Sequence, residues 1–160
     1  MPPAAERSSS LHLRRATSTD APAAAALIGG ALAGYGLPFE PDGRDADVEL
    51  FGTRADHDDF VAELGGRAVG VASVGPHGDE GLAWVSKLFV AEDARGAGIG
   101  RALLAAAHDA ARARGYDRVG LRTRRIFREA IALYGSEGYR AVSGDAAQLE
   151  AGDVVFFRPL

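Results

Sequence analysis

Residues 95–101 read RGAGIGR, a glycine-rich segment directly before a stretch with the apolar spacing of a helix. Glycine tolerates backbone angles that other residues avoid, and without side chains several N–H groups can approach one ligand. The first N–H groups of the following helix have no partner within it and carry a partial positive charge. Arg95 and Arg101 add a full charge at each end. The segment therefore predicts a cradle for phosphate groups.

The residues around these glycines distinguish between kinds of phosphate cradle. A nucleotide P-loop requires Lys and Ser/Thr after its last glycine, but Arg101 and Ala102 stand there. A dinucleotide fingerprint lacks its third glycine, because Arg101 or Leu103 occupies that position, depending on where the pattern starts. The pattern that remains is Arg-x-x-Gly-x-Gly over residues 95–100. A tight turn without a ligand is the alternative that this segment alone leaves open.

A second motif lies near the C-terminus, in the stretch LRTRRIFREAIALYGSEGY. Its characteristic residues are Ala130, Leu133, Tyr134, Gly138 and Tyr139. Together, the two motifs resemble the GCN5-related N-acetyltransferase (GNAT) family, in which Ala-x-x-Leu-Tyr precedes a short gap and Gly-Phe or Gly-Tyr. Residues 11–28 are similar to the opening strand and helix of that family, so the resemblance spans most of the chain. It implies an enzyme that transfers an acetyl group from acetyl-coenzyme A to an amine.

The resemblance also implies roles for individual residues. Residues expected to bind acetyl-coenzyme A are Leu88, Phe89 and Val90, through backbone near the thioester carbonyl, and Arg95, Gly96, Ala97, Gly98, Ile99, Gly100 and Arg101, around the pyrophosphate. Tyr134 is the implied catalytic residue, whose hydroxyl donates a proton to the departing thiolate. The alternative for Tyr134 is a buried tyrosine that only packs in the core.

Two further features qualify the implied site. Phe127 stands where many family members carry an asparagine that contacts the coenzyme, and we expect it to pack the start of a helix against the core. We expect no metal ion, because the four histidines, at positions 12, 57, 77 and 108, lack the spacing of metal ligands.

The sequence does not determine which group removes the amine proton. Relatives often carry a glutamate at the position of Trp84, which cannot accept a proton. His77, Asp79 and Glu80 lie nearby in GPHGDEG, a segment typical of a solvated turn. One of these side chains, a water relay, or an acceptor that arrives already neutral would complete the transfer.

The acceptor is expected to be a primary amine of a small molecule or peptide, and two charged clusters point to different kinds. An acidic loop with Glu40, Asp42, Asp45 and Asp47 favours a polycation. A basic cluster with Arg122, Arg124, Arg125 and Arg128 favours a carboxylate-bearing amine or the 3′-phosphate of the coenzyme. A solvated charged surface is the alternative for both. A non-catalytic acyl-coenzyme A-binding module is the rival to an enzyme.

Hydrophobic periodicity predicts the elements that must position these residues. Strands are expected at 11–16, 58–64, 67–75, 82–90, 117–123, 139–143 and 153–160. Helices are expected from Asp20, as a cap, to Gly34, from about Asp45, from the glycine-rich segment to Gly115, and over 127–138. The order β-α-α-β-β-β-α-β-α-β-β is that of an α/β domain, and the resemblance implies a mixed, mostly antiparallel sheet flanked by helices. We expect a disordered tail at 1–10 and a single acetyltransferase domain at 11–160.

Composition excludes several classes of function. The net charge of −4 disfavours nucleic-acid binding, and the absence of cysteine excludes disulfides. Arg14 and Arg15 precede the apolar run 21–36 as in a twin-arginine export signal, but the run is too short and too weakly apolar to span a bilayer. We therefore expect a cytoplasmic protein with neither a membrane nor a nucleic-acid partner. A homodimer stays open.

Overall fold

The structure is a computed structural model that describes residues 10–142 and 152–160. Seven strands form one sheet in the order β1-β2-β3-β4-β5-β7-β6. The strands are β1 (Leu11–Arg15), β2 (Asp58–Leu64), β3 (Arg67–Pro76), β4 (Leu82–Val90), β5 (Arg118–Arg124), β6 (Arg140–Val142) and β7 (Asp153–Pro159). Neighbouring strands are antiparallel except β4 and β5, which are parallel. The predicted mixed, mostly antiparallel sheet is thereby confirmed.

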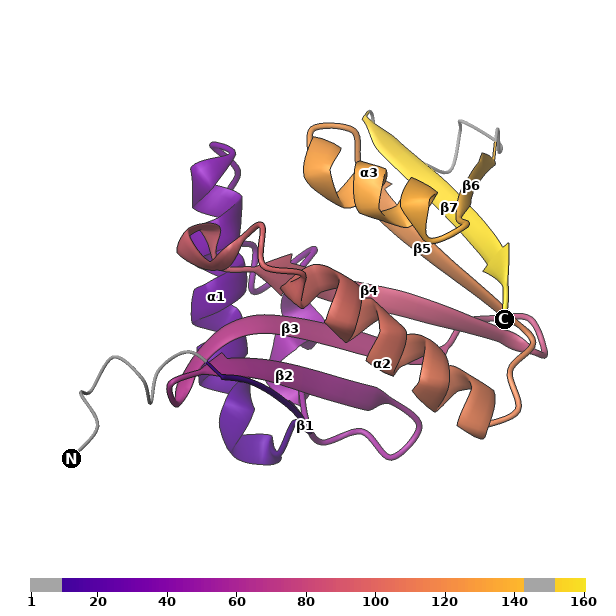
Figure 1. The fold of residues 1–160 in the computed structure, drawn as a ribbon, viewed down its shortest axis with the longest axis horizontal. Helices are drawn as coiled ribbons and strands as arrows, with labels where there is room; N and C mark the ends of the chain where they lie inside the picture. The colour runs from indigo at the N-terminus through magenta and orange to yellow at the C-terminus, as the bar shows by residue number, and fades with distance from the viewer. Residues whose placement is uncertain (1–9, 143–151) are drawn as a thin grey trace.

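Helices cover both faces of this sheet (Figure 1). The helices are α1 (Ala21–Gly34), α2 (Ile99–Ala113) and α3 (Arg128–Ser136), and the 3₁₀ helices are η2 (Ser18–Asp20), η3 (Ala46–Leu50) and η4 (Glu92–Ala94). Helix α1 packs on one face, while α2 and α3 share a core cluster on the other. The short helix expected from Asp45 is the 3₁₀ helix η3.

Close packing fixes the N-terminus of α2 against the sheet. The helix buries one face, including Ile99, Leu103, Leu104, Ala107 and Ala111, as its apolar spacing predicts. Opposite its first turns lies Gly70 of β3, where an added Cβ would come within 2.8 Å of the Leu103 side chain. Glycine at this position therefore lets α2 approach the sheet closely.

Strands β4 and β5 pair over only part of their length. Their register runs from Leu82 opposite Arg118 to Val85 opposite Leu121 and then stops. Beyond that point the two strands separate, so the backbone groups on this edge of β4 face no partner strand among the described residues. The sheet thus opens in its middle, between strands β1–β4 on one side and strands β5, β7 and β6 on the other (Figure 1).

Asp20 stands at the N-cap position of α1 as expected, but the capping bond expected from its side chain is wrong. Its carboxylate makes no capping bond to α1. Instead it accepts the Thr17 backbone N–H at 2.7 Å and two bonds from the Arg14 guanidinium at 2.8 Å. Arg14 beside it lowers the pKa of Asp20 to about 2. Asp20 therefore ties the start of α1 to β1, a role that the N-terminal sequence pattern does not reveal.

Two expectations, on the N-terminal tail and on the domain organisation, are not tested by the structure. The disordered tail expected at 1–10 lies, apart from Ser10, outside the described residues. A single domain at 11–160 stays a prediction. Within the described ranges no helix combines the length and apolar character needed to cross a membrane.

Candidate functional site

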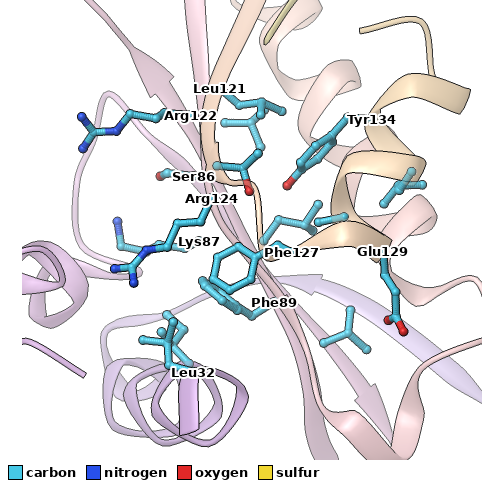
Figure 2. Close-up of a pocket in the computed structure, with 18 of the residues that line it drawn as sticks. Leu32, Ser86, Lys87, Phe89, Leu121, Arg122, Arg124, Phe127, Glu129 and Tyr134 are labelled. Carbon is cyan, nitrogen blue, oxygen red and sulfur yellow. The ribbon is translucent and has the colours of Figure 1, made fainter. Parts of the chain in front are cut away.

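A cavity of about 610 Å³ lies where β4 and β5 separate (Figure 2). Its volume is typical of a small-molecule site. The sequence-predicted residues that line it are Leu88, Phe89, Val90, Arg95, Gly96, Gly98, Ile99, Gly100, Arg101 and Tyr134. Ala97 does not line the cavity. The fold thus brings the glycine-rich segment and the Tyr134 motif to one cavity, while the roles of these residues stay predictions.

The glycine-rich segment leaves open space in front of the N-terminus of α2. Gly96 and Gly98 have φ of 84° and 79°, and a Cβ added at either would meet nothing within 4 Å. No side chain caps the helix, and the Ala102 N–H donates to the Gly98 carbonyl at 3.0 Å. The three N–H groups between them, at the first turn, therefore have no helical partner. This is the geometry of an anion-binding helix start.

The two arginines of the segment behave differently. Arg95 lines the cavity, donates its Nε to the Val90 carbonyl at 3.2 Å, and places its guanidinium 5.7 Å from the centre of the Tyr35 ring. Arg101 instead pairs with Glu137 and donates to the Ser136 hydroxyl at 3.2 Å, which ties α2 to the end of α3. Arg95 is therefore the better candidate for a direct phosphate contact.

We expect Arg95→Ala to weaken coenzyme A binding by about 1–3 kcal/mol, as for a lost hydrogen bond to a charged group. Because the contact is partly exposed, the loss should shrink at high salt. Calorimetry at low and high salt measures both, with Arg112→Ala, at the far end of α2, as the control. Equal losses at the two salt concentrations would mean that Arg95 acts through its packing on Tyr35.

Tyr134 is at once a core residue and a cavity residue. It is 5% exposed, and its ring lies 5.7 Å from that of Tyr139 and 6.1 Å from that of Phe156. Figure 2 shows its hydroxyl pointing into the cavity. Burial raises the pKa of the Tyr134 hydroxyl above its usual value, so the group stays protonated at neutral pH and can donate a proton.

Strand β4, which lines the cavity, contains a β-bulge in its pairing with β3. Val71 pairs with Phe89 but Ser73 pairs with Ser86, so the register shifts between them. Inside this shift Lys87 has φ of 56°, a left-handed conformation found at no other non-glycine residue of the described ranges. Such bulges redirect backbone groups and are frequent beside active sites. The prediction from sequence missed Lys87, although it is the one lysine of the chain.

Phe127 packs at the start of α3, as expected. Its ring lies 4.9 Å from that of Tyr35 and 6.0 Å from that of Phe89. Figure 2 shows Phe127 and Phe89 next to each other at the centre of the cavity wall. An apolar ring therefore occupies the place at which we expected an asparagine in many relatives.

The side chains expected as proton acceptors differ in whether they line the cavity. His77 lines the cavity and stacks on Trp84 with ring centres 3.8 Å apart, whereas Asp79 and Glu80 do not line it. His57 was not among the proton acceptors expected from the sequence. It also lines the cavity, and its Nδ1 lies 2.6 Å from the carboxylate of the neighbouring Asp56. The adjacent residues Asp56 and His57 were the sequence signal that could have indicated this candidate.

Both charged clusters reach the cavity in part. Its lining includes Asp45 and Asp47 of the acidic loop but not Glu40 or Asp42. It includes Arg122 and Arg124 of the basic cluster but not Arg125 or Arg128.

Comparisons with known proteins agree with this arrangement. The sequence model of the acetyltransferase (GNAT) domain matches residues 56–141. The uncharacterized N-acetyltransferase YjgM of Escherichia coli (strain K12) is 30% identical over 137 residues, which cover 81% of this chain and 82% of that protein. An acetyltransferase of the GNAT family from Staphylococcus aureus Mu50 superposes with a TM-score of 0.81 at 15% identity, covering 94% of this chain and 99% of that one.

A further solved structure shares the fold. The PaiA N-acetyltransferase from Thermoplasma acidophilum, in complex with coenzyme A, superposes with a TM-score of 0.75 at 14% identity over 94% of this chain and 99% of its own. The domain match and the E. coli relative together carry the assignment. The chain belongs to the GNAT family of N-acetyltransferases.

Proposed function

We propose that the protein transfers the acetyl group of acetyl-coenzyme A to a primary amine of a small molecule or peptide, in the cytoplasm. One observation carries the proposal: the uncapped N-terminus of α2 and the Tyr134 hydroxyl face the same cavity. The relative of the same fold solved with coenzyme A supports the same class of ligand here.

The residues present fit such a ligand. Gly96 and Gly98 leave space at the helix start for a pyrophosphate, and the guanidinium of Arg95 borders it. Between β4 and β5 the lining includes the apolar side chains of Leu88 and Leu121, which suit a narrow, largely uncharged arm. A side chain at Gly100, which also lines the cavity, would lie against Leu133 and Val90.

The chemistry asks for few groups because a bound thioester supplies an already activated carbonyl carbon. Transfer forms a C–N bond and breaks the C–S bond, while the amine loses a proton and the sulfur gains one. Backbone N–H groups of residues 88–90, on the unpaired edge of β4, would donate to the carbonyl oxygen. Tyr134 would donate the proton to the sulfur.

His57 is the group we assign to the amine proton. The Asp56 carboxylate lies 2.6 Å from Nδ1, and a proton on Nδ1 that donates to it would leave Nε2 as the acceptor. The hydrogen bond from His57 also lowers the pKa of Asp56, consistent with a carboxylate that stays ionised beside the ring. His77, stacked flat on Trp84, has no carboxylate partner among the described residues.

We expect His57→Gln to lower kcat/KM by about 10²-fold, the lower end of the contribution of a positioned base. Coenzyme A affinity should not change. His77→Gln is the matched control, and a kcat/KM that stays near the wild-type value in His57→Gln would show that another group takes the proton.

The proposed function is tested by following free thiol released from acetyl-coenzyme A in the presence of amino acids, amino-acid amides, polyamines and peptides. We expect release that depends on the amine, with one acetylated product per thiol by mass spectrometry. Calorimetry measures coenzyme A binding in parallel. Tight coenzyme binding without transfer to any amine would favour a sensing role instead, and no binding at all would contradict the proposal.

A further inference from the structure

The side chains of β5 divide between the two faces of the sheet. Leu121 and Thr123 are buried, and Leu121 packs in the same core cluster as Tyr134 and α2. Because side chains alternate along a strand, Arg122 and Arg124 project from the opposite face. Figure 2 shows both guanidinium groups on one side of the cavity and Tyr134 on the other.

Carboxylates near these arginines already have cationic partners. Asp47 accepts a bond from the Lys87 amine at 2.6 Å. Asp153, whose side chain is 1% exposed, lies 2.7 Å from a nitrogen of Arg44 and 3.6 Å from one of Arg122. The charges of Asp47 and Asp153 are therefore compensated within the protein.

Arg124 differs from its neighbours. It lies directly opposite Asp153 in the β5–β7 register, yet the Asp153 carboxylate pairs with Arg44 and Arg122 instead. Within residues 10–142 and 152–160 the Arg124 guanidinium has no hydrogen bond or ion pair, although the residue is partly buried and lines the cavity. A partly buried cation without an anion is unfavourable. A guanidinium pairs best with a carboxylate, through two parallel N–H···O bonds.

We propose that Arg124 binds a carboxylate of the acceptor, so that the acceptor is a primary amine that also carries a carboxylate, as an amino acid does. This inference rests on the proposed function. The carboxylate occupies the Arg124 side of the cavity, and the amine reaches through the opening between β4 and β5 toward the side of Tyr134.

Both other interpretations of the charged clusters fit the structure less well. A polycation would need several carboxylates without cationic partners, but Asp47 is paired with Lys87. Asp45 is then the acidic-loop carboxylate left at the cavity, and it accepts the Glu40 backbone N–H at 2.9 Å. The 3′-phosphate of the coenzyme would need Arg124 near the pyrophosphate cradle. Arg124 lies on the face of the sheet away from α2, whose N-terminus forms that cradle.

The test compares amino acids with their carboxamides, which keep the amine and lose only the negative charge. In the wild type, kcat/KM for the acid should exceed that for the amide by tenfold or more. Arg124→Gln should lower kcat/KM for the acid by about 10–100-fold, mainly through KM, and leave the amide unchanged. Arg125→Gln is the matched control, because this adjacent, exposed arginine does not line the cavity.

A binding experiment separates this inference from the proposed function. The same acids and amides are titrated calorimetrically into the protein loaded with coenzyme A, which requires no turnover. Binding of acids that Arg124→Gln abolishes would support the carboxylate site even if no acetyl transfer occurred. Equal wild-type binding of acid and amide, or equal loss of both in Arg124→Gln, would overturn it, as would preferred acetylation of polyamines.

Discussion

Gly100→Val should abolish coenzyme A binding while the protein stays folded. Gly100 lies in the first turn of α2 and lines the cavity, so a valine side chain there would take up cavity space beside the free N–H groups, against Leu133 and Val90. Its added Cβ would lie 3.3 Å from a methyl carbon of Leu133, a flexible neighbour that needs to shift only slightly. Calorimetric titration with coenzyme A should show no measurable binding, and circular dichroism should show native helix content.

Gly100 is a sharper probe than Gly98. Gly98 has φ of 79°, a conformation that strains any L side chain, so Gly98→Val would disturb the backbone and the space together. The control is Gly30→Val, a helical glycine of α1 with nothing within 4 Å of an added Cβ. It should bind coenzyme A normally. Normal binding by folded Gly100→Val would refute the phosphate cradle.

The elements that the sequence predicted well are those with strong periodic patterns. Strands β2 and β4 lie at the expected bounds, Asp58–Leu64 and Leu82–Val90, and α2 follows the glycine-rich segment as expected. The apolar runs of β2 and β4 are largely buried, and the apolar spacing of α2 matches one buried face, so local pattern and tertiary packing agree. The glycine-rich segment could be placed for the same reason, because it leads directly into α2.

The features that the sequence could not predict depend on contacts between distant segments. Lys87 is held in its left-handed conformation by a register shift against β3, which no local pattern encodes. The missing partner of Arg124 follows from the pairing of Asp153 with Arg44, more than a hundred residues away in the chain. Both features require the folded sheet.

Tyr134→Phe should lower kcat by roughly 10²–10⁴-fold and leave coenzyme A affinity nearly unchanged. The substitution keeps the ring contacts to Tyr139 and Phe156 and deletes only the hydroxyl that points into the cavity. A positioned acid contributes about this factor. A drop near 10²-fold is the value we expect, because a coenzyme A thiolate is a fairly good leaving group.

The pH dependence of this loss follows from burial. Because burial raises the pKa of Tyr134, its hydroxyl stays protonated throughout the neutral and mildly alkaline range. The ratio of wild-type to Tyr134→Phe rates should therefore be constant across that range. An alkaline limb in the wild type that disappears in Tyr134→Phe would mean that the hydroxyl ionises there, against this expectation.

Tyr139→Phe provides the matched control for the loss of a buried hydroxyl. The Tyr139 hydroxyl lies 2.6 Å from Nε2 of His108, and Tyr139 does not line the cavity. Its removal should lower the free energy of unfolding by about 1 kcal/mol, as for one lost hydrogen bond, and change kcat less than twofold. Urea unfolding and thiol-release kinetics on both variants separate stability from catalysis. If Tyr134→Phe turns over as fast as Tyr139→Phe with an active acceptor, Tyr134 is a packing residue and another group protonates the thiolate.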